Sequence, residues 1–355
     1  MRWDTCAEDI EELVRAVVPD TVELRTSGST GAAAVWRRTR EQLWAEAGLL
    51  AGLLEAERPE AVLAFAPPRH VYGALATVLM PARLRVPVWY RPGAFGGLPD
   101  PAQARRWGVV AIPSVFPVLR SRMAWVRAAE RVAVLHSTAT LPSTAAHFQD
   151  EAGPERVTLV EVFGSTESGG VAYRRWAPDN PPWTLLDDVT FAHHDAHPHD
   201  AHHDAHPHDD DPDGEVPLAV RSGRLAARPG EPAPQVWQLD DYIEPLDERR
   251  FRFRGRRNRL LKVNGRRVNL DEVEERLRAR LRCADLACLP VTDGVTGEHF
   301  EVLLVPGPGR SAAGIGLESA VAELDIRPRD VRVVERIERS ETGKLRQIQQ
   351  ASSER

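Results

Sequence analysis

Hydrophobic and polar positions follow two different periods along the chain. Between residues 39 and 57, Leu43, Ala47, Leu50 and Leu54 recur at helical spacing, which predicts an amphipathic helix. Short apolar runs alternate with helical patterns over the next hundred residues. The predicted strands are 61–65, 86–90, 109–112, 131–135 and 157–162, and the predicted helices are 72–81, 101–107, 117–129 and 142–152. Three of these helices begin with proline, which suits a first helical turn.

Strand–helix alternation of this kind predicts an α/β layer with a largely parallel sheet. The pattern changes beyond residue 215, where the runs 216–220, 235–239 and 250–254 are typical of antiparallel strands. A compact α+β unit is predicted after that. Its elements are a hairpin (260–263 and 266–269) with a type I′ turn at Asn264–Gly265, a helix at 271–281, strands at 284–290 and 300–305, a helix at 317–324 and a strand at 331–335.

The predicted fold class is therefore α/β. A large N-terminal α/β domain with mostly parallel sheets covers residues 1–256, and a small, mobile C-terminal α+β domain covers 257–355.

Length and composition narrow the class of protein. A chain of 355 residues with 42% hydrophobic content can bury a core, and no apolar stretch reaches membrane-spanning length. The N-terminus has no apolar run with a cleavage site, so no signal peptide is expected. Three unpatterned cysteines, Cys6, Cys283 and Cys288, fit a reducing compartment better than a disulfide framework. We therefore expect a cytoplasmic protein with no membrane span.

The negative net charge belongs to one segment. Residues 187–213 hold nine aspartates and no Lys or Arg, and without them the formal charge would be +3 rather than −6. No basic run with interleaved aromatics appears, so a nucleic-acid partner is not expected. Within this segment, residues 192–200 repeat letter for letter at 201–209 and hold eight of the twelve histidines. A disordered insert over 190–213 is the preferred interpretation, and a metal-binding tract is the alternative.

Lysine occurs only twice, at Lys262 and Lys344, whereas arginine occurs 44 times. A composition that uses arginine wherever charge alone suffices keeps lysine mostly where a slim, flexible ammonium is required. Both lysines lie in segments marked by glycine, residues 255–265 and 340–344. Chance remains the alternative interpretation.

Two further segments resemble ligand-binding turns. Residues 25–31, Arg-Thr-Ser-Gly-Ser-Thr-Gly, offer glycines and hydroxyls that can surround an anion, although many such segments are ordinary loops. Residues 161–167, Glu-Val-Phe-Gly-Ser-Thr-Glu, leave a strand and end in Glu167, whose carboxylate suits Mg²⁺. Phe163 is a candidate for stacking on a purine; a strand-end turn with a surface acid is the alternative. Asp241 with Arg256, fifteen residues later, would suit the hydroxyls of a ribose.

Taken together, these segments resemble the adenylate-forming superfamily, which contains acyl- and aryl-CoA synthetases, peptide-synthetase adenylation domains and luciferases. The resemblance runs from about Val22 to Arg346. The segments that carry it, in the family's order, are residues 26–31, 162–167, Asp241 with Gly255 and Arg256, residues 262–265 with Glu274, and residues 342–344. Residues 65–73 are similar to the family's acyl-pocket segment.

The resemblance implies a two-step reaction. ATP and a carboxylic acid give an acyl- or aryl-adenylate and pyrophosphate, and a thiol of CoA or of carrier-protein phosphopantetheine then takes the acyl group. The cofactors implied are ATP and Mg²⁺, and the partners implied are a small carboxylic acid and an acyl carrier protein.

The resemblance also implies a role for individual residues. The β- and γ-phosphates would contact Ser27, Gly28, Ser29, Thr30 and Gly31. The other nucleotide contacts implied are Phe163 and Gly164 at the adenine, Thr166 at the α-phosphate, Glu167 on Mg²⁺, and Asp241 with Arg256 on the ribose. Lys344 would act in adenylation and Lys262 in thioester formation, with Asn258 as the hinge of the small domain. The residues around the acid would be His70, Tyr72, Ser137 and Thr138. A lysine that neutralises two anions as they meet would lower the barrier by positioning and by charge stabilisation.

Two departures from the family pattern leave an alternative open. The phosphate loop continues as Ala32-Ala-Ala-Val-Trp-Arg37-Arg38 instead of with Pro-Lys, and we expect Arg37 or Arg38 to compensate. The loop also lies far nearer the N-terminus than in full-length members. The chain is therefore similar to compact AMP-ligases of aryl-polyene and xanthomonadin-type pathways. The alternative is a catalytically impaired relative that binds a nucleotide or acyl ligand as a partner protein.

Overall fold

In a computed structural model of the chain, the residues described are 1–6, 9–25, 34–92, 97–137, 141–192, 215–263, 266–281, 283–293, 297–307, 317–339 and Leu345. Only the backbone is described for Ser143, Asn258, Lys262, Arg267, Asp293, Gly297 and Glu318. Several sequence-based predictions lie outside these ranges. They are the glycine–hydroxyl loop 26–31, Thr138, the histidine repeat, the type I′ turn at 264–265 and Lys344.

The chain forms two compact units. Unit 1 comprises Met1–Asp209, Ala219–Gln238 and Pro245–Arg252, and unit 2 comprises Asp210–Leu218, Leu239–Glu244 and Phe253–Arg355. The strands β11 (Val216–Arg221), β12 (Trp237–Pro245) and β13 (Arg250–Arg256) contribute residues to both units. The domain boundary after Arg256 stays a prediction.

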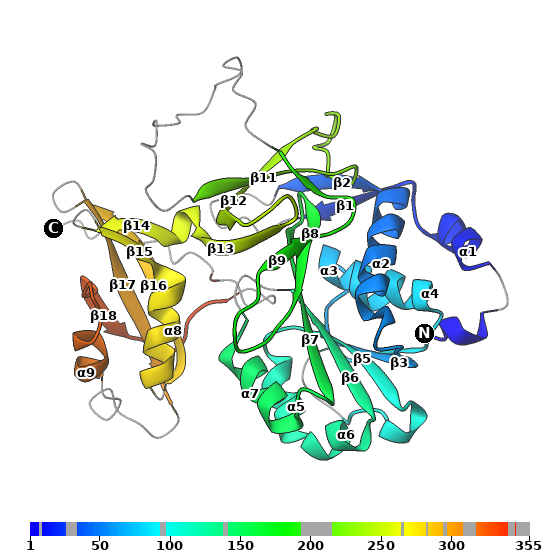
Figure 1. The fold of residues 1–355 in the computed structure, drawn as a ribbon, viewed down its shortest axis with the longest axis horizontal. Coiled ribbons are helices and arrows are strands. Elements are labelled where there is room, and N and C mark those ends of the chain that lie inside the picture. Colours follow the sequence, from blue (N-terminus) through cyan, green and yellow to red (C-terminus); the bar gives the residue numbers. More distant parts are fainter. Residues whose placement is uncertain are drawn as a thin grey trace. The chain divides into compact units, whose positions relative to one another are not determined.

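A large mixed sheet forms the centre of unit 1 (Figure 1). Its strand order is β4-β3-β5-β6-β7-β8-β9-β13, in which the first five strands run parallel and the following pairs are antiparallel. The bounds are β3 Ala61–Ala64, β4 Val88–Tyr90, β5 Arg106–Ala111, β6 Arg131–His136, β7 Val157–Ser165, β8 Gly169–Arg175 and β9 Trp183–Leu185. A short pair, β10 (Thr190–Phe191) with β11, and a separate hairpin, β1 (Thr21–Arg25) with β2 (Val35–Thr39), complete unit 1.

Helices cover both faces of the parallel strands, because alternate residues of each strand are apolar on both sides. On one face, α2 (Arg40–Glu55) and α4 (Met80–Leu84) pack on Val62, Leu135 and Val160. On the other face lie α5 (Val115–Ser121), α6 (Met123–Ala128) and α7 (Ser143–Ala152), which Figure 1 shows side by side. The remaining helices of unit 1 are α1 (Ile10–Val17) and α3 (Val71–Gly73), the latter continuous with a π-helical stretch at Ala74–Leu79.

Local sequence explains where α2 begins. Thr39 accepts a hydrogen bond from the Gln42 backbone N–H, and the Gln42 side chain accepts one from the Thr39 backbone N–H. This capping box ties the helix start to the end of β2 and confirms the predicted helix at 39–57. The predicted helix at 101–107 is wrong: only Pro101–Gln103 turns, and Trp107 lies within β5 between the rings of Trp89 and Trp125.

Unit 2 contains a small antiparallel hairpin and a three-stranded sheet. The hairpin pairs β14 (Leu260–Val263) with β15 (Arg266–Asn269). The sheet has the order β16 (Cys283–Asp293), β17 (Gly297–Pro306), β18 (Asp330–Val333) and packs on α8 (Leu270–Arg280) and α9 (Leu317–Ala322). These elements confirm the predicted hairpin strands and the α+β character of this part. Among the described residues of the whole chain, no helix combines the length and apolarity needed to cross a bilayer.

Candidate active site

The hairpin β1–β2 frames the predicted phosphate loop. Arg25 and Val35 are the last paired residues of the two strands, so the predicted phosphate loop is the segment of sequence that joins them. The hairpin is anchored on its inner side by Leu24 and Trp36, which pack with Ala226. Trp36 also meets Trp237 edge to face at 5.2 Å. The loop itself lies outside the described residues, but the strands on its two sides are held by the buried side chains of Leu24 and Trp36.

A tight turn between β7 and β8 carries Thr166 and Glu167. Ser165 and Ser168 close the turn reciprocally, because each backbone N–H donates to the other residue's Oγ at 3.2 Å. Ser168 Oγ also donates to the Gly169 carbonyl at 2.9 Å. Thr166 and Glu167 are half-buried at the tip. The Glu167 carbonyl accepts from Ala226 N–H at 2.8 Å, whereas its carboxylate has no ion-pair partner among the described residues. An unpaired carboxylate on a braced turn fits a Mg²⁺ ligand.

Two glycines make this turn possible. A Cβ on Gly164 would come within 2.1 Å of the Gly169 carbonyl oxygen. Gly169 has a φ of +69°, and a Cβ there would approach Glu46 Oε2 to 2.5 Å. Side chains larger than hydrogen are therefore excluded at both positions by close approach, and at Gly169 also by backbone conformation. The glycines predicted as part of a ligand-binding turn have a steric reason to be there.

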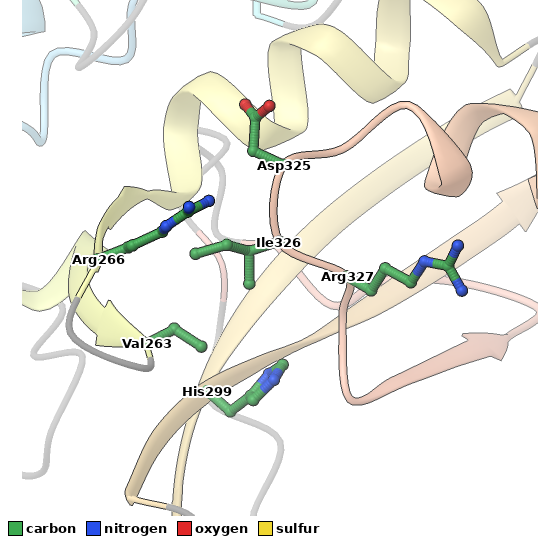
Figure 2. A pocket seen from close by; sticks show the side chains of 6 residues that line it. All are labelled: Val263, Arg266, His299, Asp325, Ile326 and Arg327. Atoms are coloured by element: carbon green, nitrogen blue, oxygen red, sulfur yellow. The ribbon is translucent and has the colours of Figure 1, made fainter.

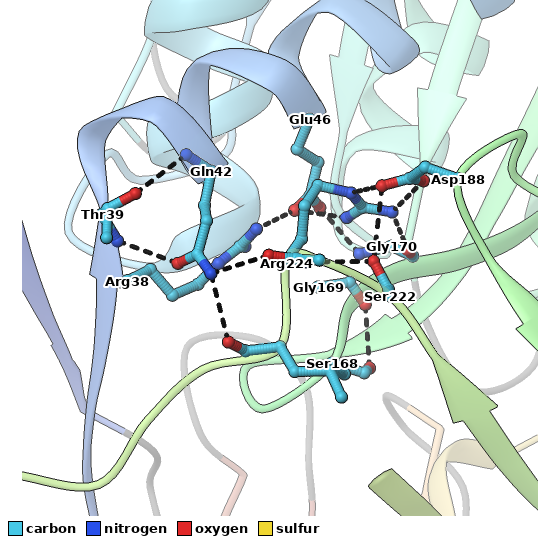
Figure 3. Close-up of polar contacts among 12 residues, drawn as sticks. Arg38, Thr39, Gln42, Glu46, Ser168, Gly169, Gly170, Asp188, Ser222 and Arg224 are labelled. Atoms are coloured by element: carbon cyan, nitrogen blue, oxygen red, sulfur yellow. Dashed lines mark hydrogen bonds and ion pairs between the residues drawn. The ribbon is translucent and has the colours of Figure 1, made fainter. Parts of the chain in front are cut away.

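A buried charge cluster lies next to the turn (Figure 3). The Glu46 carboxylate contacts Arg38 Nη2 at 2.6 Å, accepts from Arg224 Nη1 at 2.8 Å, and accepts from the Gly170 N–H at 2.7 Å. Arg224 continues the cluster by donating to both oxygens of Asp188, at 2.5 and 2.8 Å, and to the Gly170 carbonyl at 2.9 Å. Arg38, Glu46 and Arg224 are each no more than 2% exposed.

The electrostatics of this cluster are balanced. Burial by itself would raise the pKa of Glu46, but the two arginines and the Gly170 N–H outweigh it and hold that pKa below its usual value. Burial would lower the pKa of Arg224, yet Asp188 and Glu46 raise it above the ordinary value. The shifts of Glu46, Asp188 and Arg224 all favour their ionised forms, as expected for opposite charges in contact inside unit 1.

The positions of Arg37 and Arg38 bear on the missing phosphate-loop lysine. Arg38 is wholly buried against Glu46, and Arg37 forms a partly exposed ion pair with Glu23 across the hairpin at 2.8 Å. Neither guanidinium is unpaired. The expectation that one of them compensates for the absent lysine is not supported by these contacts, because each would first have to abandon a carboxylate.

Phe163 packs against two other aromatic residues. The residue is only 4% exposed, and its ring meets the rings of Trp183 and Phe251 edge to face at 5.4 and 5.9 Å. This packing does not favour stacking on a purine, and the role of Phe163 at the adenine stays a prediction. Gly164, the next residue, is exposed.

Residues predicted to surround the acid lie near the carboxyl end of β6, an edge at which open α/β sheets commonly bind ligands. Tyr72 donates to the Leu135 carbonyl at 2.7 Å, which places it beside the residues preceding Ser137. Burial raises the pKa of Tyr72, so it stays a neutral donor. His70 is half-buried before α3, and burial together with Arg69 lowers its pKa. All three of these predicted residues thus lie in unit 1. Ser137 follows the carboxyl end of β6, and His70 and Tyr72 lie at the start of α3, the first helix after β3.

Sequence reasoning missed His136, the last residue of β6. It is fully buried, packs edge to face on Phe116 at 5.1 Å, and neither ring nitrogen has a hydrogen-bond partner among the described residues. Burial lowers its pKa to about 3, so the ring is neutral at physiological pH. The sequence contained one sign of this residue: a histidine ends the apolar run of β6, immediately before the predicted site residue Ser137.

Asp241 and Arg256 meet in unit 2 as predicted. Arg256 Nε donates to Asp241 Oδ1 at 3.2 Å. Burial raises the pKa of Asp241, and Arg256 only partly offsets this. A carboxylate that accepts one long hydrogen bond among the described residues keeps acceptor capacity for ligand hydroxyls. Lys262 lies on β14 and Asn258 in the short turn before it, but their side chains are not described.

A cavity of about 370 Å³ lies in unit 2 and contains none of the predicted site residues (Figure 2). Its lining is Val263, Arg266, His299, Asp325, Ile326 and Arg327. In Figure 2 the side chain of Arg327 extends away from that of Arg266, so the two cations do not converge on one point. The cavity therefore lacks the focused charge expected of an anion site.

Known structures share this fold. The chain is similar to ATP-bound MatB from Rhodopseudomonas palustris, with 17% sequence identity, a TM-score of 0.67, and coverage of 91% of this chain and 66% of that one. It is similar to O-succinylbenzoate coenzyme A synthetase (MenE) from Bacillus subtilis in complex with ATP and magnesium, with 16% identity, a TM-score of 0.67, and coverage of 91% and 68%. A third similar structure is McyG A-PCP complexed with phenylalanyl-adenylate, with 14% identity, a TM-score of 0.69, and coverage of 91% and 64%.

No protein-family model and no curated protein sequence matches the chain. The chain spans about two thirds of the length of the solved structures it matches. At these identities the similarity establishes the fold, which is that of adenylate-forming enzymes: a large mixed sheet with a small C-terminal sheet unit. The expected fold class is confirmed.

Proposed function

We propose that the chain is an ATP-dependent carboxylate ligase. In the first step a carboxylate oxygen of the acid attacks the α-phosphorus of ATP, the bond to pyrophosphate breaks, and an acyl- or aryl-adenylate forms. In the second step a thiolate sulfur attacks the acyl carbon and AMP leaves. The acceptor is CoA or a carrier-protein phosphopantetheine. The observation that carries the proposal is the braced turn, on which the Glu167 carboxylate has no ion-pair partner among the described residues. Through Ala226 and Ala227 this turn is linked to β2, the strand that follows residues 26–33.

The roles within the proposal follow the residues present. Residues 27–31 bind the β- and γ-phosphates, and Thr166 contacts the α-phosphate. Glu167 holds Mg²⁺, which supplies charge neutralisation of the phosphates. Asp241, supported by Arg256, accepts from ribose hydroxyls. Phe163 and Gly164 border the adenine. His70, Tyr72, Ser137 and Thr138 surround the acid, and Asn258 is the hinge of the small domain.

The two lysines complete the mechanism. Lys344 bridges the acid carboxylate and the α-phosphate, so it screens the repulsion between two anions in the transition state of adenylation. Lys262 acts in thioester formation. None of the similar structures named above is described as an aryl-polyene or xanthomonadin ligase, so the proposal goes no further than the class of reaction.

Carboxylate-dependent ATP–pyrophosphate exchange tests the proposal. We expect exchange with at least one acid from a panel of aryl and fatty acids, and a loss of about 10²–10³-fold in kcat for Lys344→Ala. Lys344→Arg is the matched control for charge: it keeps the positive charge but not the slim ammonium, and we expect it to stay impaired. Lys262→Ala should spare exchange and slow thioester formation; equal loss in both half-reactions would contradict that division.

A second candidate function is favoured by one observation. Arg37 and Arg38 are both paired, so nothing described replaces the missing phosphate-loop lysine. A catalytically impaired relative that binds nucleotide or acyl ligand as a partner protein would have this property. Absence of exchange across the whole panel, together with measurable ATP binding, would favour this function over the ligase.

A further inference from the structure

Glu46 is the meeting point of two segments that are far apart in the sequence. Arg38, one of its partners, lies on β2, the strand that leaves residues 26–33. Gly170, another partner, lies on β8 directly after the turn that carries Thr166 and Glu167. The same carboxylate therefore ties both proposed phosphate-contacting segments to helix α2 (Figure 3).

A second connection runs parallel to the first through residues 222–227. Ala227 exchanges two backbone hydrogen bonds with Arg37 of β2, at 2.8 and 2.9 Å, and the adjacent Ala226 donates to the Glu167 carbonyl at 2.8 Å. The Gln42 side chain donates to the Gly223 carbonyl at 2.9 Å. Arg224, in the middle of this segment, is held by Glu46 and Asp188. Both connections between β2 and the turn thus depend on Glu46, directly or through Arg224.

The steric fit leaves little freedom in this arrangement. Gly169 approaches the cluster so closely that an added Cβ would meet Glu46 Oε2, Arg224 Nη1 and Arg38 Nη1 at 2.5, 2.9 and 3.1 Å. The Glu46 side chain is 3% exposed and its charge is matched by buried arginines, so it has no access to a ligand. Its contribution must therefore be made through the segments that it holds.

We propose that Glu46 is a positioning residue that holds the 165–169 turn in place against β2, the strand that follows residues 26–33 in the sequence. The inference rests on the proposed function, because it concerns the two segments assigned to the phosphates and Mg²⁺. Displacement of a phosphate-contacting group by about 1 Å can cost about a hundredfold in rate. The expected consequence of losing Glu46 is therefore a selective defect in the use of ATP.

Glu46→Gln is the central variant. The glutamine carbonyl can still accept from the Gly170 N–H, but its NH₂ group offers Arg38 and Arg224 a donor instead of a charge. The matched control is Glu55→Gln, which neutralises an exposed acid on the same helix. We expect the KM for ATP in exchange assays to rise about ten- to hundredfold in Glu46→Gln, with the KM for the acid unchanged, and both constants to stay at wild-type values in Glu55→Gln.

Hydrogen exchange supplies a readout independent of catalysis. We expect peptides covering 162–175 and 222–228 to lose protection in Glu46→Gln, while a peptide covering 123–136, which includes α6 and β6, keeps it. A double variant, Arg38→Met with Glu46→Leu, separates stability from positioning. It removes Arg38 and Glu46 together, while Arg224 keeps Asp188 and the Gly170 carbonyl as partners. The thermal midpoint should therefore lie above that of Glu46→Ala while the KM for ATP stays raised.

Each result decides something. Unchanged protection of 162–175 in Glu46→Gln overturns the mechanical link. If the peptide 162–175 loses protection but the KM for ATP is unchanged, Glu46 has no role in nucleotide use. The same conclusion follows if both the thermal midpoint and the KM for ATP return to wild-type values in the double variant. A wild-type protein that neither exchanges pyrophosphate nor binds ATP refutes the proposed function instead, and hydrogen exchange still decides whether Glu46 holds the turn.

Discussion

Each unit contains a buried carboxylate paired with arginine, and the two carboxylates behave in opposite ways. In unit 1, Glu46 receives two guanidinium groups and a backbone N–H, and its pKa lies below the usual value. In unit 2, Asp241 receives one guanidinium at 3.2 Å, and its pKa is raised by burial. The difference shows that the number of donors, together with burial, decides the direction in which the pKa of a buried acid moves.

The comparison also separates two kinds of role. A carboxylate has about four acceptor positions, and at Glu46 most of them are used by the protein itself. At Asp241 most of them are unused by the described residues, and its partner Arg256 keeps 31% of its side chain exposed. A saturated acid can hold the structure together, whereas an unsaturated acid beside solvent can accept hydrogen bonds from a ligand. The predictions below are ordered by expected effect and test this distinction.

The largest effect is expected from Glu46→Ala. It leaves Arg38 and Arg224 without their shared counter-charge, so the free energy of unfolding of unit 1 should fall by about 3–5 kcal/mol. All nine tryptophans lie between residues 3 and 237 in unit 1, so tryptophan fluorescence during urea unfolding reports on this unit. Glu55→Ala, on the exposed side of the same helix, should change stability by less than about 0.5 kcal/mol. If both variants lost a similar free energy of unfolding, the conclusion that the Glu46 cluster stabilises unit 1 would be wrong.

Asp241→Asn should act on binding instead. Loss of charge-assisted hydrogen bonds to ribose hydroxyls should weaken Mg·ATP binding by about 1.5–3 kcal/mol, measured by titration calorimetry. Unit 1 fluorescence should unfold at the wild-type urea concentration. The neighbouring Asp240, which is exposed, provides the control Asp240→Asn. Equal weakening by both variants would indicate a general charge effect rather than a contact made by Asp241.

A smaller effect is expected at His136, a buried titratable group with no hydrogen-bond partner among the described residues. Its folded pKa of about 3 lies below the ordinary 6.5, so the unfolded chain binds the extra proton over this range. Stability is therefore complete above about pH 6.5 and falls as the pH drops toward 3, by about 1.4 kcal/mol at pH 5.5. In His136→Phe this contribution should vanish, so the stability difference between variant and wild type should shift in favour of the variant between pH 7.5 and 5.5. A pH-independent difference would contradict the assignment.

Local pattern was sufficient for much of the fold. The strands β3, β6 and β7 and the helix α2 were predictable because their apolar periods coincide with their burial. The failure at 101–107 came from Trp107, whose place in β5 is set by Trp89 and Trp125 rather than by its sequence neighbours. The packing of Phe163 could not be predicted for a similar reason, since Trp183 and Phe251, whose rings it meets, lie twenty and eighty-eight residues away.

The charge cluster could be anticipated only in part. Glu46 lies between Leu43 and Leu50 on the apolar face of α2, so an acid on a buried face was visible in the sequence. Its partners could not be identified, because Arg224 contacts it across 178 residues. The turn at 165–168 was predictable from its glycine, hydroxyl and acid pattern, but its brace by Ala226 was not, since that contact is made by backbone atoms.

The division of the chain has a consequence for engineering. Following the residue ranges, the polypeptide passes from one unit to the other five times. A single truncation therefore cannot yield either unit intact, because unit 2 needs residues 215–218 and 239–244 as well as its long C-terminal stretch. Recombination with a homologous enzyme would have to exchange these short stretches together with the tail, so crossover points should be chosen from spatial neighbours rather than from a single junction in the gene.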